Sequence, residues 1–341
     1  MPRRTLLVAL ALLASACGQS GGNPFAASSP SRAPSPSASI LFVSGSWTNE
    51  VGRPRELLAV AADGSGFEQL TNCARATQPC DILQVAPSPD RNRVVAVRTT
   101  PDAEAGAQVL FFMDLARSVE SVLFARRRIE FADWSHDGSF LLYSSITGQT
   151  GNEDMFTAGP DGTNEQNLTD SLNVRERSGR IDPSGRTAAF ERVCTVQSDT
   201  CPNPGVSHVF LFRETPITTG PATGPELPDT PYVVGSDASP TFSPDGTSLV
   251  FRRLTGTGNG GLGTWDLLVV ALAAGATPRT LVTGPLFRGA PDWGLGGILY
   301  VETDAASNRS ELVKILPDGS GRTVLRTENS GFRMGSPRWL P

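Results

Sequence analysis

The stretch FSPDGTSLVF, residues 242–251, decides the fold. An aromatic residue is followed by Ser-Pro-Asp-Gly, which is typical of a tight turn, and then by residues that favour a β-strand. Asp245 is expected to cap backbone amides of the turn, and Gly246 is expected to adopt a positive φ. The stretch therefore predicts two strands joined by a tight turn.

Related stretches recur along the chain. They are VAPSPDRNRVVAV from Val85, ADWSHDGSFLLYSS from Ala132, GRIDPSGRTAAF from Gly179, PDWGLGGILYV from Pro291 and SPRWLP from Ser336. The residue in the aromatic position, here called the marker residue, is in turn Pro87, Trp134, Ile181, Phe242, Trp293 and Trp339, with spacings of 47, 47, 61, 51 and 46 residues. Repeats of this length are typical of the blades of a β-propeller, and six markers predict six blades.

A second hairpin signal lies between successive markers, for example LVKILPDGSGRTVL at residues 312–325. Each repeat thus offers four strands, A to D, of which A precedes the turn. The last copy stops after strand A, whereas residues 40–44 read like a strand B with no strand A before it. We therefore expect an all-β, six-bladed β-propeller that is closed by pairing of its N- and C-terminal strands.

The repeat FSPDGTSLVF, followed by a strand and a Pro-Asp-Gly turn, resembles the repeat of the TolB-like β-propeller family. The resemblance covers residues 40–341 and is weakest at Trp293, where residues 294–297 replace the Ser-Pro-Asp-Gly turn. It implies, as one possible role, a structural part of an envelope assembly. Residues 40–341 leave no room for the separate α/β domain of TolB, which argues against a direct equivalent.

The N-terminal residues are expected to direct export. Arg3 and Arg4 precede an apolar run at residues 6–13, so residues 1–16 are predicted to be a cleaved signal peptide. Ala14-Ser15-Ala16-Cys17 resembles a bacterial lipobox, which implies that Cys17 is lipidated. The Ser-, Pro- and Gly-rich residues 17–39 are predicted to form a flexible tether, and residues 40–341 the propeller.

The remaining four cysteines form two pairs of equal spacing, Cys73 with Cys80 and Cys194 with Cys201. In an exported protein these pairs predict two local disulfides. Neither Cys-x-x-Cys spacing nor neighbouring His residues support a metal site. The predicted location is therefore that of a membrane-anchored lipoprotein, on the periplasmic side of an outer membrane or the outer face of a cell membrane.

The composition excludes some partners. The chain of 341 residues has 39% hydrophobic residues, 35 Gly and 27 Pro, which favours tight turns over long helices. Its net charge of -5 and pI of about 5.2 provide no basic field for nucleic acid. Nucleic-acid binding is therefore not expected.

The residue before each marker lies on an innermost strand and is expected to face the central channel. These residues are Ala86, Asp133, Arg180, Thr241, Asp292 and Arg338. Because consecutive blades are neighbours, Asp133 is expected to face Arg180, and Asp292 to face Arg338. Structural ion pairs and a polar ligand site at the axis are both open interpretations. The marker aromatics themselves are expected to pack between blades.

Arginines gather on the face formed by the D–A and B–C loops, here called the rim face. The candidate ligand-binding residues of this face are Arg126, Arg127, Arg128, Arg175, Arg177 and Arg288. Guanidinium groups suit carboxylate or phosphate partners. We therefore expect a monomeric binding propeller without catalysis or cofactor, whose partner is an envelope protein or an anionic envelope ligand.

The alternative function is an envelope enzyme, a polysaccharide lyase or glycan hydrolase that uses channel carboxylates. A hydrolase of the prolyl-peptidase kind is not expected, because no Gly-x-Ser-x-Gly elbow occurs in residues 40–341. TolB-like pectate-type lyases hold a metal with several His, and this chain has only His136 and His208. Asn152-Glu153-Asp154 is expected to be a solvated loop and not a calcium site.

Overall fold

The computed structural model describes residues 33–46, 54–73, 81–99, 108–114, 119–124, 129–147, 152–196, 204–213, 236–273, 275–329 and 331–341. Within these ranges the regular structure is β-strand, and there is no α-helix. The all-β prediction is confirmed. The Gly- and Pro-rich composition favours this result, because both residues weaken helices and serve tight turns.

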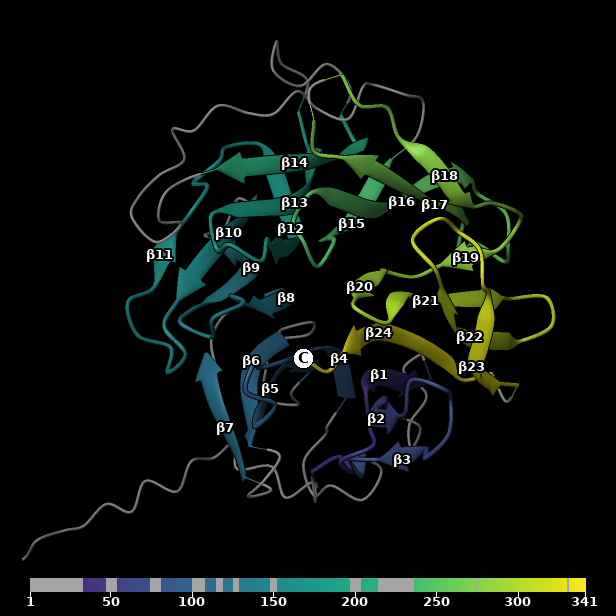
Figure 1. The fold of residues 1–341 in the computed structure, drawn as a ribbon. Helices are drawn as coiled ribbons and strands as arrows, with labels where there is room; N and C mark the ends of the chain where they lie inside the picture. The colour runs from purple at the N-terminus through teal and green to yellow at the C-terminus, as the bar shows by residue number, and fades with distance from the viewer. Residues whose placement is uncertain are drawn as a thin grey trace, which may run out of the picture.

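The strands group into blades around a central axis (Figure 1). Blade 1 has strands β4 (Asp81–Pro87), β5 (Arg93–Thr99), β6 (Gln108–Asp114) and β7 (Val119–Phe124). Blade 2 has β8 (Ile129–Trp134), β9 (Leu141–Thr147), β10 (Asn152–Ala158) and β11 (Gln166–Asn167). The described part of blade 3 has β12 (Val174–Ile181), β13 (Thr187–Cys194) and β14 (Ser207–Arg213), and one parallel bridge between β10 and β12 links it to blade 2.

The other blades follow the same antiparallel order. Blade 4 has β15 (Asp237–Phe242), β16 (Ser248–Gly256), β17 (Thr264–Ala271) and β18 (Arg279–Val282). Blade 5 has β19 (Phe287–Arg288), β20 (Asp292–Gly294), β21 (Gly297–Asp304), β22 (Arg309–Ile315) and β23 (Thr323–Glu328). Blade 6 combines β24 (Arg333–Trp339) with β1 (Ile40–Gly45), β2 (Glu56–Val60) and β3 (Glu68–Gln69).

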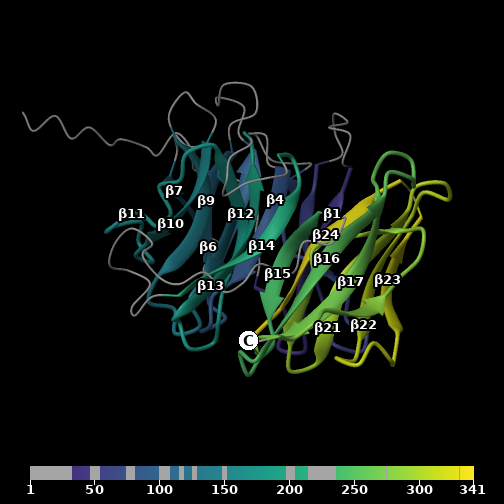
Figure 2. The same cartoon turned by 90° about the horizontal axis from the view of Figure 1, so that it is seen from above.

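The two ends of the described chain meet in blade 6. Strand β24 pairs antiparallel with β1, with Ile40 opposite Trp339, so the expected pairing of the terminal strands is present. The innermost strands β24, β4, β8, β12, β15 and β20 contact one another in a closed cycle. Figure 2 shows the same blades from the side, with β24 beside β1.

Apolar side chains fill the spaces between neighbouring blades. The Trp134 ring on β8 stacks on Phe112 of β6 at 5.5 Å between centroids, and its Nε1 donates to the Ala86 carbonyl at 3.1 Å. Phe242 is also buried, against β13 and β14 of the preceding blade. The predicted packing of marker aromatics between blades is therefore confirmed at these two positions, and burial of such rings is a main source of stability.

The Ser-Pro-Asp-Gly turns connect strands A and B as expected. In the turn at residues 243–246, Asp245 Oδ1 accepts hydrogen bonds from Ser243 Oγ at 2.5 Å and from the Thr247 amide at 3.0 Å. These bonds hold the pKa of Asp245 below its ordinary value. Gly246 has a φ of 71°, a backbone conformation that glycine adopts without strain. All these turns lie on one face of the ring, here called the turn face.

The blade 5 turn departs from the repeat because a side chain from blade 6 covers it. The Trp339 indole packs on Gly294 and Gly296, and its Nε1 donates to the Gly297 carbonyl at 2.9 Å. A Cβ on Gly294 or Gly296 would clash with the indole ring. Gly294 and Gly296, which replace the Ser-Pro-Asp-Gly turn, therefore form the surface on which the Trp339 indole packs.

Replacing Gly296 with Ala is expected to lower the free energy of unfolding by about 1–3 kcal/mol, because the new methyl group overpacks the Trp339 contact. Urea denaturation would measure the loss. Gly258→Ala is the matched control, since Gly258 is also exposed and its Cβ would meet only Thr264, at an ordinary 3.7 Å. Equal stability of the two variants would show that close packing of Gly296 against Trp339 does not contribute to the stability of the fold.

The cysteine predictions fall partly outside the described residues. Cys73 and Cys194 are each disulfide-bonded, and both are buried. Their predicted partners, Cys80 and Cys201, lie outside the described residues. The pairing of Cys73 with Cys80 and of Cys194 with Cys201 stays a prediction.

Residues 1–32, with the predicted signal peptide and Cys17, also lie outside the described residues. The last part of the predicted tether does not behave as one. Ala38 is 1% exposed, and the Ser35 amide donates to Glu68 Oε1 at 2.9 Å, so residues 33–39 pack on blade 6. Small residues without periodicity gave no sign of these contacts, which are made mainly by the backbone. No helix that could cross a bilayer occurs in the described part of the chain.

Candidate functional site on the propeller axis

The residues before the markers are turned toward the axis by irregularities in the innermost strands. The pairing of β12 with β13 shifts register between Arg177 and Arg180, and that of β15 with β16 shifts between Ala238 and Thr241. Such bulges bend a strand and change the direction of its side chains. The side chains of Arg180 and its counterparts therefore meet near the axis instead of alternating into the blades.

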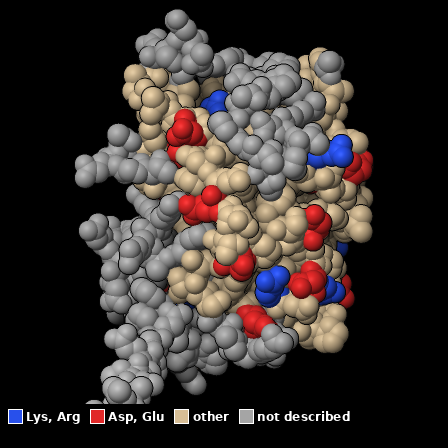
Figure 3. Space-filling view, turned by 90° about the vertical axis from the view of Figure 1, so that its left-hand side faces the viewer, with Lys and Arg blue, Asp and Glu red and all other residues tan. Residues whose placement is uncertain are grey.

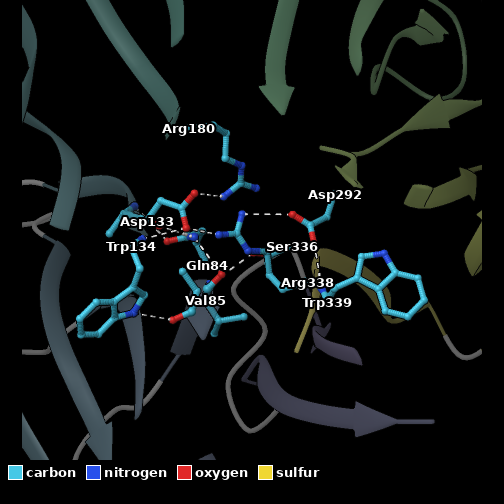
Figure 4. Close-up of polar contacts among 11 residues, drawn as sticks. Gln84, Val85, Asp133, Trp134, Arg180, Asp292, Ser336, Arg338 and Trp339 are labelled. Atoms are coloured by element: carbon cyan, nitrogen blue, oxygen red, sulfur yellow. Dashed lines mark hydrogen bonds and ion pairs between the residues drawn. The ribbon is translucent and has the colours of Figure 1, made fainter. Parts of the chain in front are cut away.

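Four of these residues form one buried ionic layer across the channel (Figure 4). Arg180 Nη1 lies 3.2 Å from Asp133 Oδ2, and Arg338 Nη1 lies 3.5 Å from Asp292 Oδ1. Both ion pairs expected between neighbouring blades are therefore present. In addition, Arg338 Nη2 donates to Asp133 Oδ1, which links the two pairs into a single layer.

The link between Arg338 and Asp133 spans blade 1, and the sequence reasoning missed it. Blade 1 contributes Ala86 to the same ring of positions, and this small, buried residue leaves room for the Arg338 side chain. The sequence contained a sign of this link. Ala86 is the smallest residue among the six positions before the markers, so a long side chain such as that of Arg338 can extend past it. Only adjacent blades were considered in the prediction.

The layer is charge-balanced but costly to desolvate. Burial raises the pKa of Asp133 to about 6, against the opposing effect of Arg180. Burial also raises the pKa of Asp292 to about 6, again against Arg180. Backbone amides hold both carboxylates in place, since Trp134 N donates to Asp133 Oδ1 and Trp339 N donates to Asp292 Oδ2. The carboxylate oxygens are thus already engaged by the protein.

A funnel of about 520 Å³ opens from this layer onto the turn face. Its wall is formed by all six marker residues: Pro87, Trp134, Ile181, Phe242, Trp293 and Trp339. Its mouth is formed by the second residue after each marker: Pro89, His136, Pro183, Pro244, Leu295 and Pro341. The repeat therefore builds three stacked rings, with a charged floor, an apolar wall and a mouth rich in proline.

The funnel has the properties of a binding site. Concave sites that take ligands are mostly apolar and carry a few polar groups at fixed positions. Trp293 and Trp339 are half-buried, and Leu295 at the mouth is 97% exposed. An exposed leucine beside aromatic rings offers apolar surface that a partner could cover.

The rim arginines are only partly available. Arg126, Arg127 and Arg128 lie outside the described residues, and their role stays a prediction. Arg175 is exposed. Arg177 is half-buried between Glu191, at 3.1 Å, and Glu130, at 3.7 Å.

The assignment of Arg288 to the rim is wrong. Arg288 is 2% exposed, because its segment is strand β19 and not a loop. It forms an ion pair with Glu302 at 2.8 Å and donates to the Trp265 and Thr283 carbonyls. Its role is to join strands inside the molecule.

Two further expectations concern acids and His. Asn152-Glu153-Asp154 is not a solvated loop but the start of β10, and both acids are 2% exposed. Burial raises the pKa of Glu153 to about 7. His136 is exposed at the funnel mouth, and His208 lies on β14. In the described ranges, no group of three or more His, Cys, Asp and Glu residues is placed to hold a metal ion.

Figure 3 shows the charged side chains on one side of the ring. Acidic and basic side chains lie singly or in small mixed groups among uncharged residues on the described surface of that side. Such a mixture gives no field of one sign that would attract a charged partner. The described features that converge on one place are those of the axis.

Comparison with solved structures identifies the class of the fold. No family model matches the sequence, and no curated protein matches it. The fold is that of a β-propeller: the chain is similar to a propeller-containing structure of a nidogen/laminin complex, with a TM-score of 0.57 and 12% identity over 89% of this chain and 98% of that chain.

Within this class the structural neighbours are TolB and TolB-like propellers. TolB from Acinetobacter baumannii is similar with a TM-score of 0.67 and 16% identity, over 89% of this chain and 67% of that one. A putative TolB from Agrobacterium tumefaciens is similar with a TM-score of 0.58 and 14% identity, over 89% of this chain and 99% of that one. Identities this low establish the shared fold alone.

Proposed function

We propose that this protein is a binding propeller, which holds a segment of a partner protein in the axial funnel and carries out no catalysis. The observation that carries the proposal is the funnel itself, about 520 Å³ in volume with an apolar wall above a charged floor. A volume of this size takes a few side chains and not a whole domain. The partner would therefore insert a short segment and cover the surrounding turn face.

The floor supports a partner that carries an anionic group. Asp133 and Asp292 already accept hydrogen bonds from guanidinium or amide groups. By contrast, Arg338 Nη1 is buried, makes no hydrogen bond to the described residues and lies 3.5 Å from Asp292 Oδ1, so it can still donate. Unused donors favour an acceptor, and a carboxylate matches a guanidinium best. An acidic side chain beside apolar residues in the partner segment is the chemistry that fits.

The turn face, and not the rim face, is the binding face in this proposal. The described rim arginines are engaged in ion pairs or buried, apart from Arg175. The funnel has all six marker residues in its wall. An export signal and a lipid on Cys17 would tether the propeller to a membrane in the cell envelope, and this location is part of the same proposal.

The enzyme alternative rests on one observation, the raised pKa values of Asp133 and Asp292. Carboxyl groups with a pKa of about 6 can serve as general acids. Both of them are ion-paired to arginine, which suits a structural floor better than free proton transfer. Cleavage of envelope glycans that is lost in Asp292→Asn and kept in the exposed-site variant Arg186→Gln would establish the enzyme.

A photo-crosslinking experiment in the cells that produce the protein tests the binding face. Benzoylphenylalanine at Leu295, on the funnel mouth, is expected to capture one defined protein, identified by mass spectrometry. The matched control places it at Leu172, which is 80% exposed and precedes β12, so that it lies at the opposite end of the blades. Trp293→Ala should weaken capture at Leu295, since truncating a central aromatic residue costs about 2 kcal/mol of binding.

The two other outcomes reject the proposal in different ways. Capture from Leu172 alone would move the binding site to the rim face, as the arginine pattern in the sequence suggested. Capture from neither position would exclude protein binding at both ends of the axis. Capture from Leu295 that Trp293→Ala leaves unchanged would place the contact outside the funnel.

A further inference from the structure

A second cavity lies on the other side of the ionic layer. Its volume is about 240 Å³, and Arg180 lines both this cavity and the funnel. Its apolar lining is formed by Leu83, Phe131, Leu262, Phe287, Met334 and Pro337. Three arginines, Arg180, Arg252 and Arg333, also line it, and its described lining includes no acidic residue. The inner cavity, as we call it, is therefore mostly apolar and is lined by guanidinium groups, of which that of Arg180 is ion-paired to Asp133.

Arg252 is a cation without a counter-ion among the described residues. It projects from β16 and makes one hydrogen bond, from Nη1 to the Arg288 carbonyl at 3.1 Å. Its Nε is buried and has no hydrogen-bond partner in the described part of the chain. Burial lowers the pKa of Arg252 to about 10, so the group still carries its charge at neutral pH. A buried charge without a partner is unfavourable unless something else compensates it.

The acid that acts most strongly on Arg252 is already engaged. Glu191 favours the charged form of Arg252 through space. However, Glu191 Oε1 accepts hydrogen bonds from Arg177 Nε at 3.2 Å and from Arg177 Nη2 at 3.1 Å. Arg177 itself opposes the charge on Arg252. Arg252 thus keeps a positive charge that no ion pair with the described residues neutralises.

Aromatic rings hold two of the guanidinium groups in position. The Arg252 guanidinium lies 4.2 Å from the Trp265 ring centroid, and that of Arg180 lies 4.7 Å from the Phe131 centroid. Stacking on a ring fixes the plane of a guanidinium group and leaves its N–H edge free to donate. Arg180 Nε is also buried, and no described residue accepts a hydrogen bond from it. Two preorganised donors of neighbouring blades therefore serve one small cavity.

We propose that the inner cavity binds a small carboxylic acid with an apolar body, at a site distinct from the funnel. The carboxylate would accept hydrogen bonds from Arg252 and Arg180, and the apolar body would contact the rings and aliphatic side chains. The volume is below the range of about 300–1,000 Å³ that drug-sized ligands occupy, which excludes a peptide. A bare inorganic anion would leave the apolar lining without a partner.

Binding of benzoate to the purified protein tests the proposal without any partner protein. Calorimetry and thermal unfolding are measured with benzoate, with the neutral isostere benzamide and with inorganic phosphate. Benzoate is expected to bind and to raise the melting temperature, as a ligand of the folded state must. Benzamide and phosphate are expected to bind at least about tenfold more weakly, because each lacks either the charge or the apolar body.

Arg252→Met should lower the affinity for benzoate by at least about tenfold, the scale of one lost charged hydrogen bond. Arg186→Met, at an exposed position outside both cavities, is the matched control and should bind as the wild type does. Without ligand, Arg252→Met should melt at the same or a higher temperature, because Met replaces an uncompensated buried charge. This readout separates lost binding from lost folding.

Each remaining outcome overturns the inference. Equal binding of benzoate and benzamide would show that the charge has no role, and binding of phosphate alone would exclude the carboxylic acid class. Unchanged benzoate affinity in Arg252→Met would place the ligand elsewhere. None of these results depends on the funnel, so the proposed partner binding would stand or fall on its own experiment.

Discussion

Replacing Arg338 with Met is expected to lower the free energy of unfolding by about 3–5 kcal/mol at neutral pH, the cost of breaking a buried ion pair from one side. Arg338 is 5% exposed and pairs with both Asp133 and Asp292. Its loss leaves one carboxylate with Arg180 alone and the other without an ion pair. Urea denaturation at pH 7 would measure the change.

Arg186→Met is the control for this experiment, because Arg186 is exposed and its loss should change stability by less than about 0.5 kcal/mol. A second variant combines Arg338→Met with Asp133→Asn and Asp292→Asn. This variant should recover part of the lost stability, since it removes the acids together with their partner. A loss below about 1 kcal/mol in Arg338→Met would show that the ionic layer is not a coupled unit.

The same layer predicts a pH dependence. The pKa values of Asp133 and Asp292 are about 6 in the folded protein, above the ordinary 3.8 of an aspartate. Between these values the folded state binds more protons than the unfolded state, so the contribution of these groups to stability falls as the pH rises from about 4 to about 6. Asp133→Asn with Asp292→Asn should flatten the urea midpoint in this window. An unchanged slope would assign the pH dependence to other groups.

Deleting residues 339–341 is expected to destabilise the whole propeller by up to about 3–5 kcal/mol, the cost of truncating a large aromatic side chain that packs against its neighbours. Trp339 closes the ring through its pairing with Ile40 and through the bond from its Nε1 to Gly297. The Leu340 amide also donates to the Ser39 carbonyl at 2.8 Å. The melting temperature of the purified domain measures the effect.

Deleting Pro341 alone is the control, because this residue is exposed and makes none of these contacts. It should melt close to the wild type. Trp339→Ala should account for most of the loss in the longer deletion, which would locate the effect in the indole and not in the backbone of the closing strand. An unchanged melting temperature after deletion of all three residues would refute the role of the terminal strand in closure.

The repeated elements were predictable because each depends on local chemistry. The turn residues Ser243 and Asp245 make the expected hydrogen bonds, and the spacing of the markers predicts where the innermost strands lie. The facing pairs followed from the order of the blades alone, without any distance. Asp133 and Arg180 meet because a ring places consecutive copies side by side.

The features that sequence reasoning missed depend on contacts between distant residues. Arg288 resembles a loop arginine until its segment pairs with β21, and Glu153 resembles a solvated acid until its strand is enclosed. The funnel, on which the proposed function rests, gave no such signal in the sequence. Counting arginines on loops favoured the rim face, whereas the funnel arises from proline, aromatic and leucine positions that carry no charge. Arg252 gave no signal at all, since its missing counter-ion is a property of the packed molecule.

The pairing of β24 with β1 has a consequence for how the protein is made. Blade 6 begins with β1 near the N-terminus, but its innermost strand, β24, comes from residues 333–339. Strand β24 also carries Arg338, which pairs with the buried Asp133 and Asp292. Contacts of such long sequence separation form late, because the entropy of closing the intervening chain must be overcome first. Until the last strand leaves the ribosome, β1 therefore lacks its inner neighbour and Asp292 lacks its ion-pair partner.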